Sequence, residues 1–381
     1  MKTKERFDYL FVLWGMSFHE NPGAVNRQVY SLSNKLARDK KKVGIIFVSY
    51  YSVAKKYHMA RDEGMKFRIK SLLSGFLYSR FISHIPLYFF KKRNNSVLDR
   101  EISLYASGIN LPLLDAGHVV TSYWWGVILA GQVYQKEKIY FIVYHDYYYD
   151  ILNSNRENIG ELEKAYSSSY IILANKALRK KFQWNPPMIT EGIDTEKYRC
   201  NGDINSKIED IILVPLRNNP LKGVEYAIPA LKMIHREFPE VKIVSYGDAM
   251  SNIPDFIDFQ HVISDETLRE YYCKTTYFIL PSIVEGIPEP LLEAMAAGCA
   301  CISTACGGPQ EVINDGVNGM LVPVKDPESI FVAFKKLYRD KNLTRSIMAQ
   351  AMESAMKYDL NRTYEDFVNA IKFYDSKNNL L

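Results

Sequence analysis

The chain has 381 residues, of which 47% are hydrophobic and 24% charged, and its formal net charge is +5. This composition is typical of a globular protein with an ample core, and the length is comfortable for two domains. No stretch approaches the roughly 20 apolar residues that a transmembrane helix needs. The five cysteines form no C-x-x-C pair, which argues against a zinc site.

The first residues superficially resemble a signal peptide. In MKTKERFDYLFVLWGM, however, Asp8 interrupts the apolar run, the run is short, and no small-residue cleavage site follows. We therefore expect residues 9–14 to form the first strand and the protein to be cytoplasmic. Cys299, Cys301 and Cys306 are then expected to be small buried residues in a reducing compartment.

The first predicted strand leads into a loop that ends at Pro22-Gly23. An amphipathic helix is predicted next, because apolar residues recur at helical spacing. These residues are Val25, Val29, Leu32 and Leu36. The apolar run 43–48 then predicts a second strand, so this part of the chain is expected to form a βαβ unit with parallel strands.

Residues 54–100 differ from the rest of the chain in charge. They contain 11 lysines and arginines against three acidic residues, a net charge of +8, so the remainder of the chain sums to −3. Within 64–95, apolar residues fall at helical spacing among basic ones, and an aromatic stretch ends at Lys91-Lys92-Arg93. Such a segment suits an anionic membrane surface or an acceptor that carries phosphate, and equally an ordinary helix with solvated charges. Nucleic acid is disfavoured because no nucleic-acid motif accompanies this local patch.

Three further strands are predicted from apolar runs at 119–122, 139–143 and 170–173. His145 follows the second of them, at the carboxyl end of a strand, where open α/β sheets bind ligands. A lone histidine is more often structural than functional. The prolines and glycine of PPMITEGID, residues 186–194, indicate a domain boundary.

The second half begins with an apolar strand at 211–215, followed by LRNNPLKG and an amphipathic helix. Arg217 and Lys222 therefore lie on a loop between the carboxyl end of a strand and the start of a helix. Two cations at such a place can bind a diphosphate, because arginine contacts two oxygens at once and lysine adds a point charge. In a loop of unknown position, the same residues would be solvated surface charges.

Residues 281–319 carry the densest pattern of the chain. They follow an apolar run, 277–280, which predicts a buried strand. A short helix is expected to begin near Pro290 and to end before Gly298, and the run 299–304 predicts the next strand.

Two carboxylates bracket the loop before this short helix. Glu285 precedes the helix, and Glu293 lies in its first turns, with seven residues between them. Both can face the space beyond the carboxyl end of the preceding strand. Two carboxylates are poorly suited to binding a phosphate group, which is also negatively charged. They are well suited to accepting hydrogen bonds from the hydroxyls of a sugar or ribose that is attached to the phosphate.

These motifs together resemble glycosyltransferase family 4, group 1. The resemblance rests on Glu285-Gly286, Leu292-Glu293-Ala294-Met295-Ala296, Gly298, Gly307-Gly308, Glu311, Gly316 and Asn318-Gly319. The stretch from Pro215 to Gly223 resembles the family pattern G-R-x-x-x-x-K-G, with Leu216 directly before Arg217 and Pro215 near the usual glycine. Residues 191–194 resemble the family's N-G-V-D linker, with Glu191 in place of asparagine. The resemblance covers nearly all of 190–375 and only the outline of the first half, where Gly23 stands without the paired glycines usual in the family.

The resemblance implies an α/β fold of the GT-B class, with two Rossmann-like domains facing each other across a cleft. Residues 1–190 would form the acceptor-side domain, and residues 191–360 the donor domain that binds a nucleotide sugar. The apolar residues at helical spacing near the end of the chain fit the helix, within 361–381, that crosses back to the first domain in this fold.

The resemblance also implies a retaining, metal-independent transferase of the hexosyltransferase type, with no cofactor, in agreement with the absence of a D-x-D motif. Arg217 and Lys222 would stabilise the leaving diphosphate, and Glu285 would hold the sugar hydroxyls. His145 would support the sugar from the opposite wall, and Glu293 would bind the ribose hydroxyls. The other donor-binding candidates are Gly286, Ile287, Pro288, Leu292 and Gly23.

The expected partners are a nucleotide-sugar donor and a glycan or lipid-linked acceptor, as in cell-surface polysaccharide biosynthesis, with no nucleic acid. A UDP-sugar is favoured over a GDP-sugar, and 64–95 is the candidate segment for peripheral contact with the inner face of a membrane. Three alternatives remain at this point: a nucleotide-sugar binding subunit without turnover, an epimerase, and a phosphorylase. The base, the sugar and the acceptor are not specified by the sequence.

Overall fold

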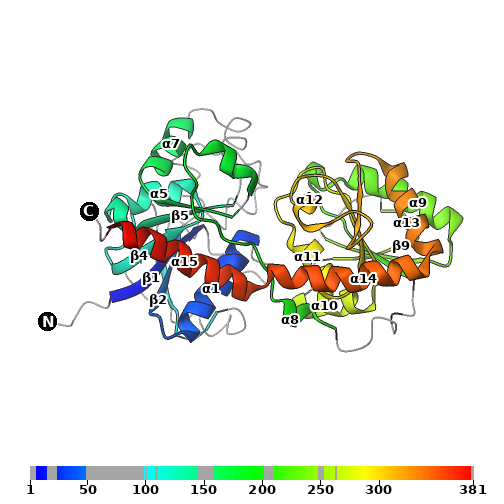
Figure 1. Ribbon diagram of the computed structural model, residues 1–381, viewed down its shortest axis with the longest axis horizontal. Helices are drawn as coiled ribbons and strands as arrows, with labels where there is room; N and C mark the ends of the chain where they lie inside the picture. Colours follow the sequence, from blue (N-terminus) through cyan, green and yellow to red (C-terminus); the bar gives the residue numbers. More distant parts are fainter. Residues whose placement is uncertain are drawn as a thin grey trace. The chain divides into compact units, whose positions relative to one another are not determined.

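The computed structural model describes residues 6–14, 24–48, 98–99, 101–107, 110–144, 158–174, 176–200, 207, 210–247, 253–261 and 264–378. The chain divides into two compact units, shown in Figure 1. Unit 1 comprises Met1–Thr190 and Thr363–Leu381, and unit 2 comprises Glu191–Arg362. The basic segment 64–95 lies outside the described residues. Within the described ranges, no helix is long and apolar enough to cross a membrane.

Unit 1 contains a six-stranded parallel sheet with the strand order β3-β2-β1-β4-β5-β6. In chain order its elements are β1 (Arg6–Trp14), α1 (Ala24–Arg38), β2 (Val43–Val48), β3 (Ser103–Ser107), β4 (Asp115–Thr121), α5 (Trp124–Ala130), η1 (Lys136–Lys138), β5 (Ile139–Val143), α7 (Ile159–Ser167), β6 (Tyr170–Leu173), η3 (Lys176–Lys181) and most of α15 (Leu360–Asn378). Strand order reverses between β1 and β4, which is the topology of a Rossmann-like sheet.

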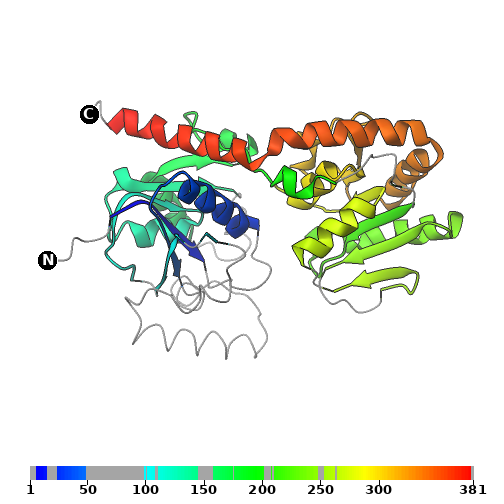
Figure 2. The same ribbon diagram turned by 90° about the horizontal axis from the view of Figure 1, so that it is seen from below.

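The sheet of unit 1 is covered by helices on both faces. Successive residues of β1 point to opposite sides: Leu10 and Val12 pack with α5 and α7, whereas Phe11 and Leu13 pack with α1 and α15. This two-sided burial explains why the central strands are continuous apolar runs. Figure 2 shows α15 running along the sheet of this unit.

The C-terminal helix α15 is fixed to unit 1 by polar contacts as well as by packing. Asp366 accepts hydrogen bonds from the backbone nitrogen and hydroxyl of Thr190, at 3.0 and 2.7 Å. Asp375 accepts one from Tyr140 at 3.0 Å, and Tyr374 donates to the carbonyl of Ile171 at 2.6 Å. The end of the chain is therefore an integral layer of unit 1.

Unit 2 has a second six-stranded parallel sheet, with the order β12-β11-β10-β7-β8-β9. Its elements are α8 (Thr195–Tyr198), β7 (Ile211–Pro215), η5 (Pro220–Lys222), α9 (Val224–Glu237), β8 (Lys242–Tyr246), β9 (Ile257–Gln260), α10 (Asp265–Lys274), β10 (Tyr277–Leu280), α11 (Glu289–Ala296), β11 (Ala300–Thr304), α12 (Pro309–Val312), β12 (Met320–Val322), α13 (Pro327–Arg339), α14 (Lys341–Ala355) and η6 (Met356–Tyr358).

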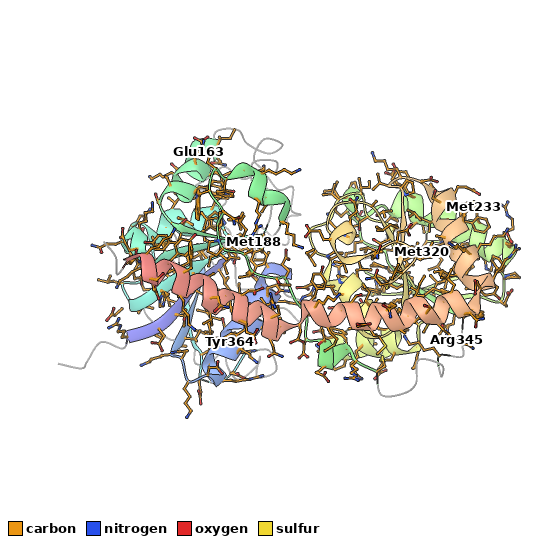
Figure 3. All side chains as sticks on the ribbon, viewed as in Figure 1. Glu163, Met188, Met233, Met320, Arg345 and Tyr364 are labelled. Atoms are coloured by element: carbon orange, nitrogen blue, oxygen red, sulfur yellow. A yellow bond between two sulfur atoms is a disulfide. The ribbon has the colours of Figure 1, made fainter. Side chains whose placement is uncertain are left out.

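Helices cover both faces of this second sheet too. Helices α9 and α13 pack on one face, whereas α10 and α11 pack on the other. Helix α14 contributes side chains to both hydrophobic cores, because Ile347 belongs to the first core and Ala351 to the second. Met320 of β12, labelled in Figure 3, is among the buried side chains of the first core.

The cysteines of unit 2 fall into two groups. Cys299, Cys301 and Cys306 are buried and unpaired, which confirms the expectation that they are small core residues. Cys200 and Cys273, 73 residues apart, form a disulfide with a Cα–Cα distance of 5.6 Å. It links the chain that follows α8 to the last turn of α10. This disulfide differs from the reducing environment expected from the sequence, and the spacing of the cysteines gives no indication of it.

Candidate functional site

The candidate site lies at the carboxyl edge of the sheet of unit 2. The strands β7 and β10 are neighbours there, and the strand order reverses between them, because β8 and β9 extend to one side and β11 and β12 to the other. Loops that leave two adjacent parallel strands in opposite directions open a crevice, and open α/β sheets bind ligands at this point. The loop after β7 carries Arg217 and Lys222, and the loop after β10 carries Glu285.

Backbone hydrogen bonds hold these loops together. Ile283 donates to the carbonyl of Leu221 at 2.8 Å, which joins the loop after β10 to the loop after β7. Glu285 donates to the carbonyl of Cys306 at 3.1 Å, and Gly308 donates to that of Glu285 at 3.1 Å, which joins the loop after β11 to the same cluster. Three loops of unit 2 are therefore fixed to one another around Glu285.

Two glycines make this close approach possible. Gly223 has a φ of +66°, and a Cβ there would lie 1.9 Å from the carbonyl oxygen of Pro281. A Cβ on Gly308 would lie 1.7 Å from the carbonyl oxygen of Gly286. The φ of Gly308 is −52°, which any residue can adopt, so lack of space alone requires glycine at this position.

Replacing Gly308 with alanine is expected to displace the loop around Gly286, since backbone atoms and not a flexible side chain occupy the space. We expect the free energy of unfolding to fall by about 1–3 kcal/mol, together with weaker binding of a nucleoside diphosphate. Thermal unfolding and calorimetric titration would measure the two effects. Gly160→Ala in α7, where a Cβ meets nothing within 4 Å, is the matched control and should be neutral or stabilising. Wild-type values for both properties of Gly308→Ala would contradict the expectation.

Lys222 and Glu285 form an ion pair across two of the loops. Lys222 Nζ lies 2.7 Å from Glu285 Oε1, and the hydroxyl of Ser282 donates to the same oxygen at 2.7 Å. The side chain of Glu285 is 13% exposed and that of Lys222 is 32% exposed. The two loops thus hold a cation and a carboxylate in fixed positions at the carboxyl edge of the sheet, with both side chains partly exposed.

Arg217 lies on the same loop as Lys222, directly beyond the core residue Leu216. Its side chain is half-buried, and no carboxylate within the described ranges pairs with its guanidinium. Gly247 at the end of β8 leaves room for this loop, since a Cβ there would lie 2.0 Å from the carbonyl oxygen of Leu216 and 3.4 Å from Arg217 Cγ. The guanidinium remains available for a bidentate contact with an anion.

Glu293 lies on α11 and is almost completely buried, with 5% of its surface exposed. Its Oε2 accepts a hydrogen bond from the hydroxyl of Tyr272 on α10 at 3.0 Å, and the hydroxyls of Tyr272 and Tyr246 lie 3.1 Å apart. Burial raises the pKa of the Tyr272 hydroxyl well above its usual value, so this group stays protonated. The sequence singles out neither tyrosine, because an aromatic residue in a helix or strand normally indicates core.

The remaining candidate residues differ in their exposure. Gly286 and Ile287 are half-buried, and Pro288 is the buried N-cap of α11. The side chain of Leu292 is completely buried and packs in the core. The positions of His145 and Gly23 lie outside the described residues.

Comparison with known proteins identifies the second half of the chain. Residues 210–340, within unit 2, match the family model described as glycosyl transferases group 1, which confirms the resemblance to group 1 glycosyltransferases for these residues. MJ1607 of Methanocaldococcus jannaschii, an uncharacterized glycosyltransferase, is 27% identical over 56% of this chain and 62% of the relative. AmsK of Erwinia amylovora, an amylovoran biosynthesis glycosyltransferase, is 28% identical over 38% of this chain and 40% of the relative. The chain thus spans less than two-thirds of the length of these relatives.

Solved structures identify the fold over nearly the whole chain. The structure of Anabaena Alr3699/HepE in complex with UDP-glucose superposes with a TM-score of 0.64, covering 96% of this chain and 99% of HepE, at 13% sequence identity. At this identity the likeness shows the fold alone. Together with the two parallel sheets, it confirms the predicted α/β architecture of the GT-B class.

Proposed function

Because residues 210–340 match the family model of glycosyl transferases group 1 and the chain has the GT-B fold, we propose that the protein is a retaining hexosyltransferase. It would transfer a sugar from a nucleoside diphosphate sugar to a glycan or lipid-linked acceptor. The observation that carries this proposal is the ion pair of Lys222 with Glu285 at the point where the strand order of unit 2 reverses. Glu293, on the helix that follows Glu285, adds a second carboxylate, which is buried.

The chemistry of sugar transfer gives each of these groups a task. Breaking the bond to the sugar leaves negative charge on the nucleoside diphosphate, and fixed positive groups beside that charge lower the barrier. Arg217 and Lys222 supply these charges, and the N-terminus of α11 adds a partial positive charge. Glu285 would then accept hydrogen bonds from the hydroxyls of the sugar, and Glu293 from those of the ribose. His145 is proposed to border the sugar.

The finer details of donor and acceptor are also proposals. We favour a UDP-sugar over a GDP-sugar, in a transfer that needs no metal ion and no cofactor. A role in cell-surface polysaccharide biosynthesis is supported by the name of the relative AmsK. Peripheral contact with an anionic membrane is supported by the basic and aromatic composition of residues 64–95.

The proposal is tested by incubating the protein with UDP-, GDP- and ADP-sugars and measuring release of the free nucleotide. We expect release from one donor, and a loss of about 100-fold in Arg217→Ala, because a preorganised positive charge on the leaving group is removed. Arg236→Ala, at the last turn of α9, is a control that should leave release unchanged.

Other outcomes of the same assay separate the alternatives. A donor that binds without cleavage, even when acceptors are added, would indicate a binding subunit. Release of a free epimerised sugar without an acceptor would indicate an epimerase, and a requirement for inorganic phosphate would indicate a phosphorylase. Absence of both binding and cleavage for every donor would refute the proposed function.

A further inference from the structure

Two buried tyrosines in unit 2 form a hydrogen-bonded group with Glu293. They lie on α10 and β8, which carry none of the residues given a role in the proposed function. Tyr272 is on α10 and completely buried, and Tyr246 is the last residue of β8 and 4% exposed. Their hydroxyl oxygens lie 3.1 Å apart, and Tyr272 donates to Glu293 Oε2 at 3.0 Å. Three separate elements therefore contribute to one line of hydrogen-bonded groups that ends at the Glu293 carboxylate, beside an otherwise apolar core.

The direction of these hydrogen bonds follows from the number of protons. A phenol carries a single proton, and an ionised carboxylate can only accept. Since Tyr272 gives its proton to Glu293, the bond between the two phenols must be donated by Tyr246. The chain of bonds thus runs from Tyr246 to Tyr272 to Glu293, and each bond polarises and strengthens the next.

Both tyrosines are held by rigid parts of the unit. Tyr272 packs edge-on against Tyr198 and Phe278, with ring centroids 6.0 and 5.8 Å away. The carbonyl of Tyr246 accepts a hydrogen bond from the backbone of Leu216 at 2.9 Å, directly before Arg217. The orientation of the Glu293 carboxylate is therefore set by the sheet and by α10 before any ligand arrives, which is the usual requirement for precise recognition.

We propose that Tyr272, supported by Tyr246, is a positioning residue that orients Glu293 to accept hydrogen bonds from the ribose hydroxyls of the donor nucleotide. This inference rests on the proposed function. A carboxylate has about four acceptor positions, so Glu293 can accept from Tyr272 and from a ribose diol together. Loss of the phenol would let the carboxylate turn away from the diol, and the ribose hydroxyls would then contribute less to binding.

The test compares the affinities of a ribonucleotide and an analogue without the hydroxyls. Dissociation constants for UDP and 2′,3′-dideoxy-UDP, and for the same pair of guanine nucleotides, are measured by calorimetric titration. Wild type is expected to prefer the ribonucleotide by at least roughly tenfold, since the analogue leaves a buried polar group without its partner. In Tyr272→Phe this preference should fall several-fold, and in Tyr246→Phe it should fall less.

Tyr277→Phe is the matched control for these variants. Tyr277 is also completely buried, and its hydroxyl donates to a carboxylate, that of Asp210 at 3.3 Å, but it lies at the opposite end of β10 from the site. It should lose comparable stability and keep the wild-type preference. Glu293→Gln should lose most of the preference.

The outcomes distinguish this inference from the proposed function. If wild type binds no nucleoside diphosphate, both fail. If Glu293→Gln abolishes the preference for ribose while Tyr272→Phe and Tyr246→Phe retain it, the function stands and the positioning role is refuted. Equal weakening of UDP and its dideoxy analogue in Tyr272→Phe would show a purely structural role, and an unchanged preference in Glu293→Gln would show that Glu293 does not contact the ribose.

Discussion

Lys222→Met is expected to lower the rate of donor cleavage by about 100- to 1000-fold while leaving unit 2 folded. The methionine side chain keeps most of the length and loses the charge that would stabilise the leaving diphosphate. The fold should tolerate the change because the lysine side chain is 32% exposed and the Glu285 carboxylate, although only 13% exposed, keeps its hydrogen bond from Ser282. Single-turnover release of the nucleotide and circular dichroism would measure the two properties.

Unit 2 provides a closely matched control for this variant. Lys335 on α13 also has a side chain that is 32% exposed, and it pairs with Glu237 at the same 2.7 Å. Lys335→Met removes a lysine charge of the same exposure and should keep wild-type activity, at a smaller structural cost because Glu237 is 32% exposed and still pairs with Arg339. In the double variant Lys222→Met/Glu285→Gln, the losses should be less than multiplicative, because the two residues share one ion pair. Retention of more than a third of the wild-type rate by Lys222→Met would refute its role.

The central strands of both sheets could be predicted from the sequence, and several edge strands could not. Apolar runs predict the central strands β2, β5, β7 and β10 at their observed bounds, because strands buried on both faces require such runs, and they also predict the edge strand β6, which is mostly buried. The strands β3, β9 and β12 lie at sheet edges. In β9 only the first of four residues is buried, so no continuous apolar pattern marks it. The conformation of an edge strand is set by pairing with its neighbour, which local sequence does not encode.

The residues of the candidate site could be predicted, but not their pairing. The spacing of Glu285 and Glu293 within a βαβ unit places both at one edge of the sheet. The ion pair with Lys222 spans 63 positions and depends on Gly223 and Gly308, whose steric role appears only when the loops are in place. The contact of Tyr272 with Glu293 could not be predicted either. The aromatic ring of Tyr272 fits the core pattern of α10, and only the position of its hydroxyl in the structure reveals the contact.

Reduction of the Cys200–Cys273 disulfide is expected to lower the free energy of unfolding of unit 2 by about 4 kcal/mol. The crosslink closes a loop of 73 residues, and the entropy of the unfolded chain rises when a loop of this length is released. For a unit of this size, the expected decrease in Tm is about 10 °C. Differential scanning calorimetry with and without a phosphine reductant measures the change.

The control for this prediction is Cys200→Ser, whose Tm should match that of the reduced wild type and should not respond to reductant. Thiol titration in denaturant verifies the chemistry, because three free thiols should be found before reduction and all five cysteines after it. The outcome also bears on the site. Cys273 directly follows Tyr272, so the crosslink fixes the last turn of α10, from which Tyr272 reaches Glu293. A Tm that stays constant while the thiol count rises from three to five would show that the disulfide does not stabilise the unit.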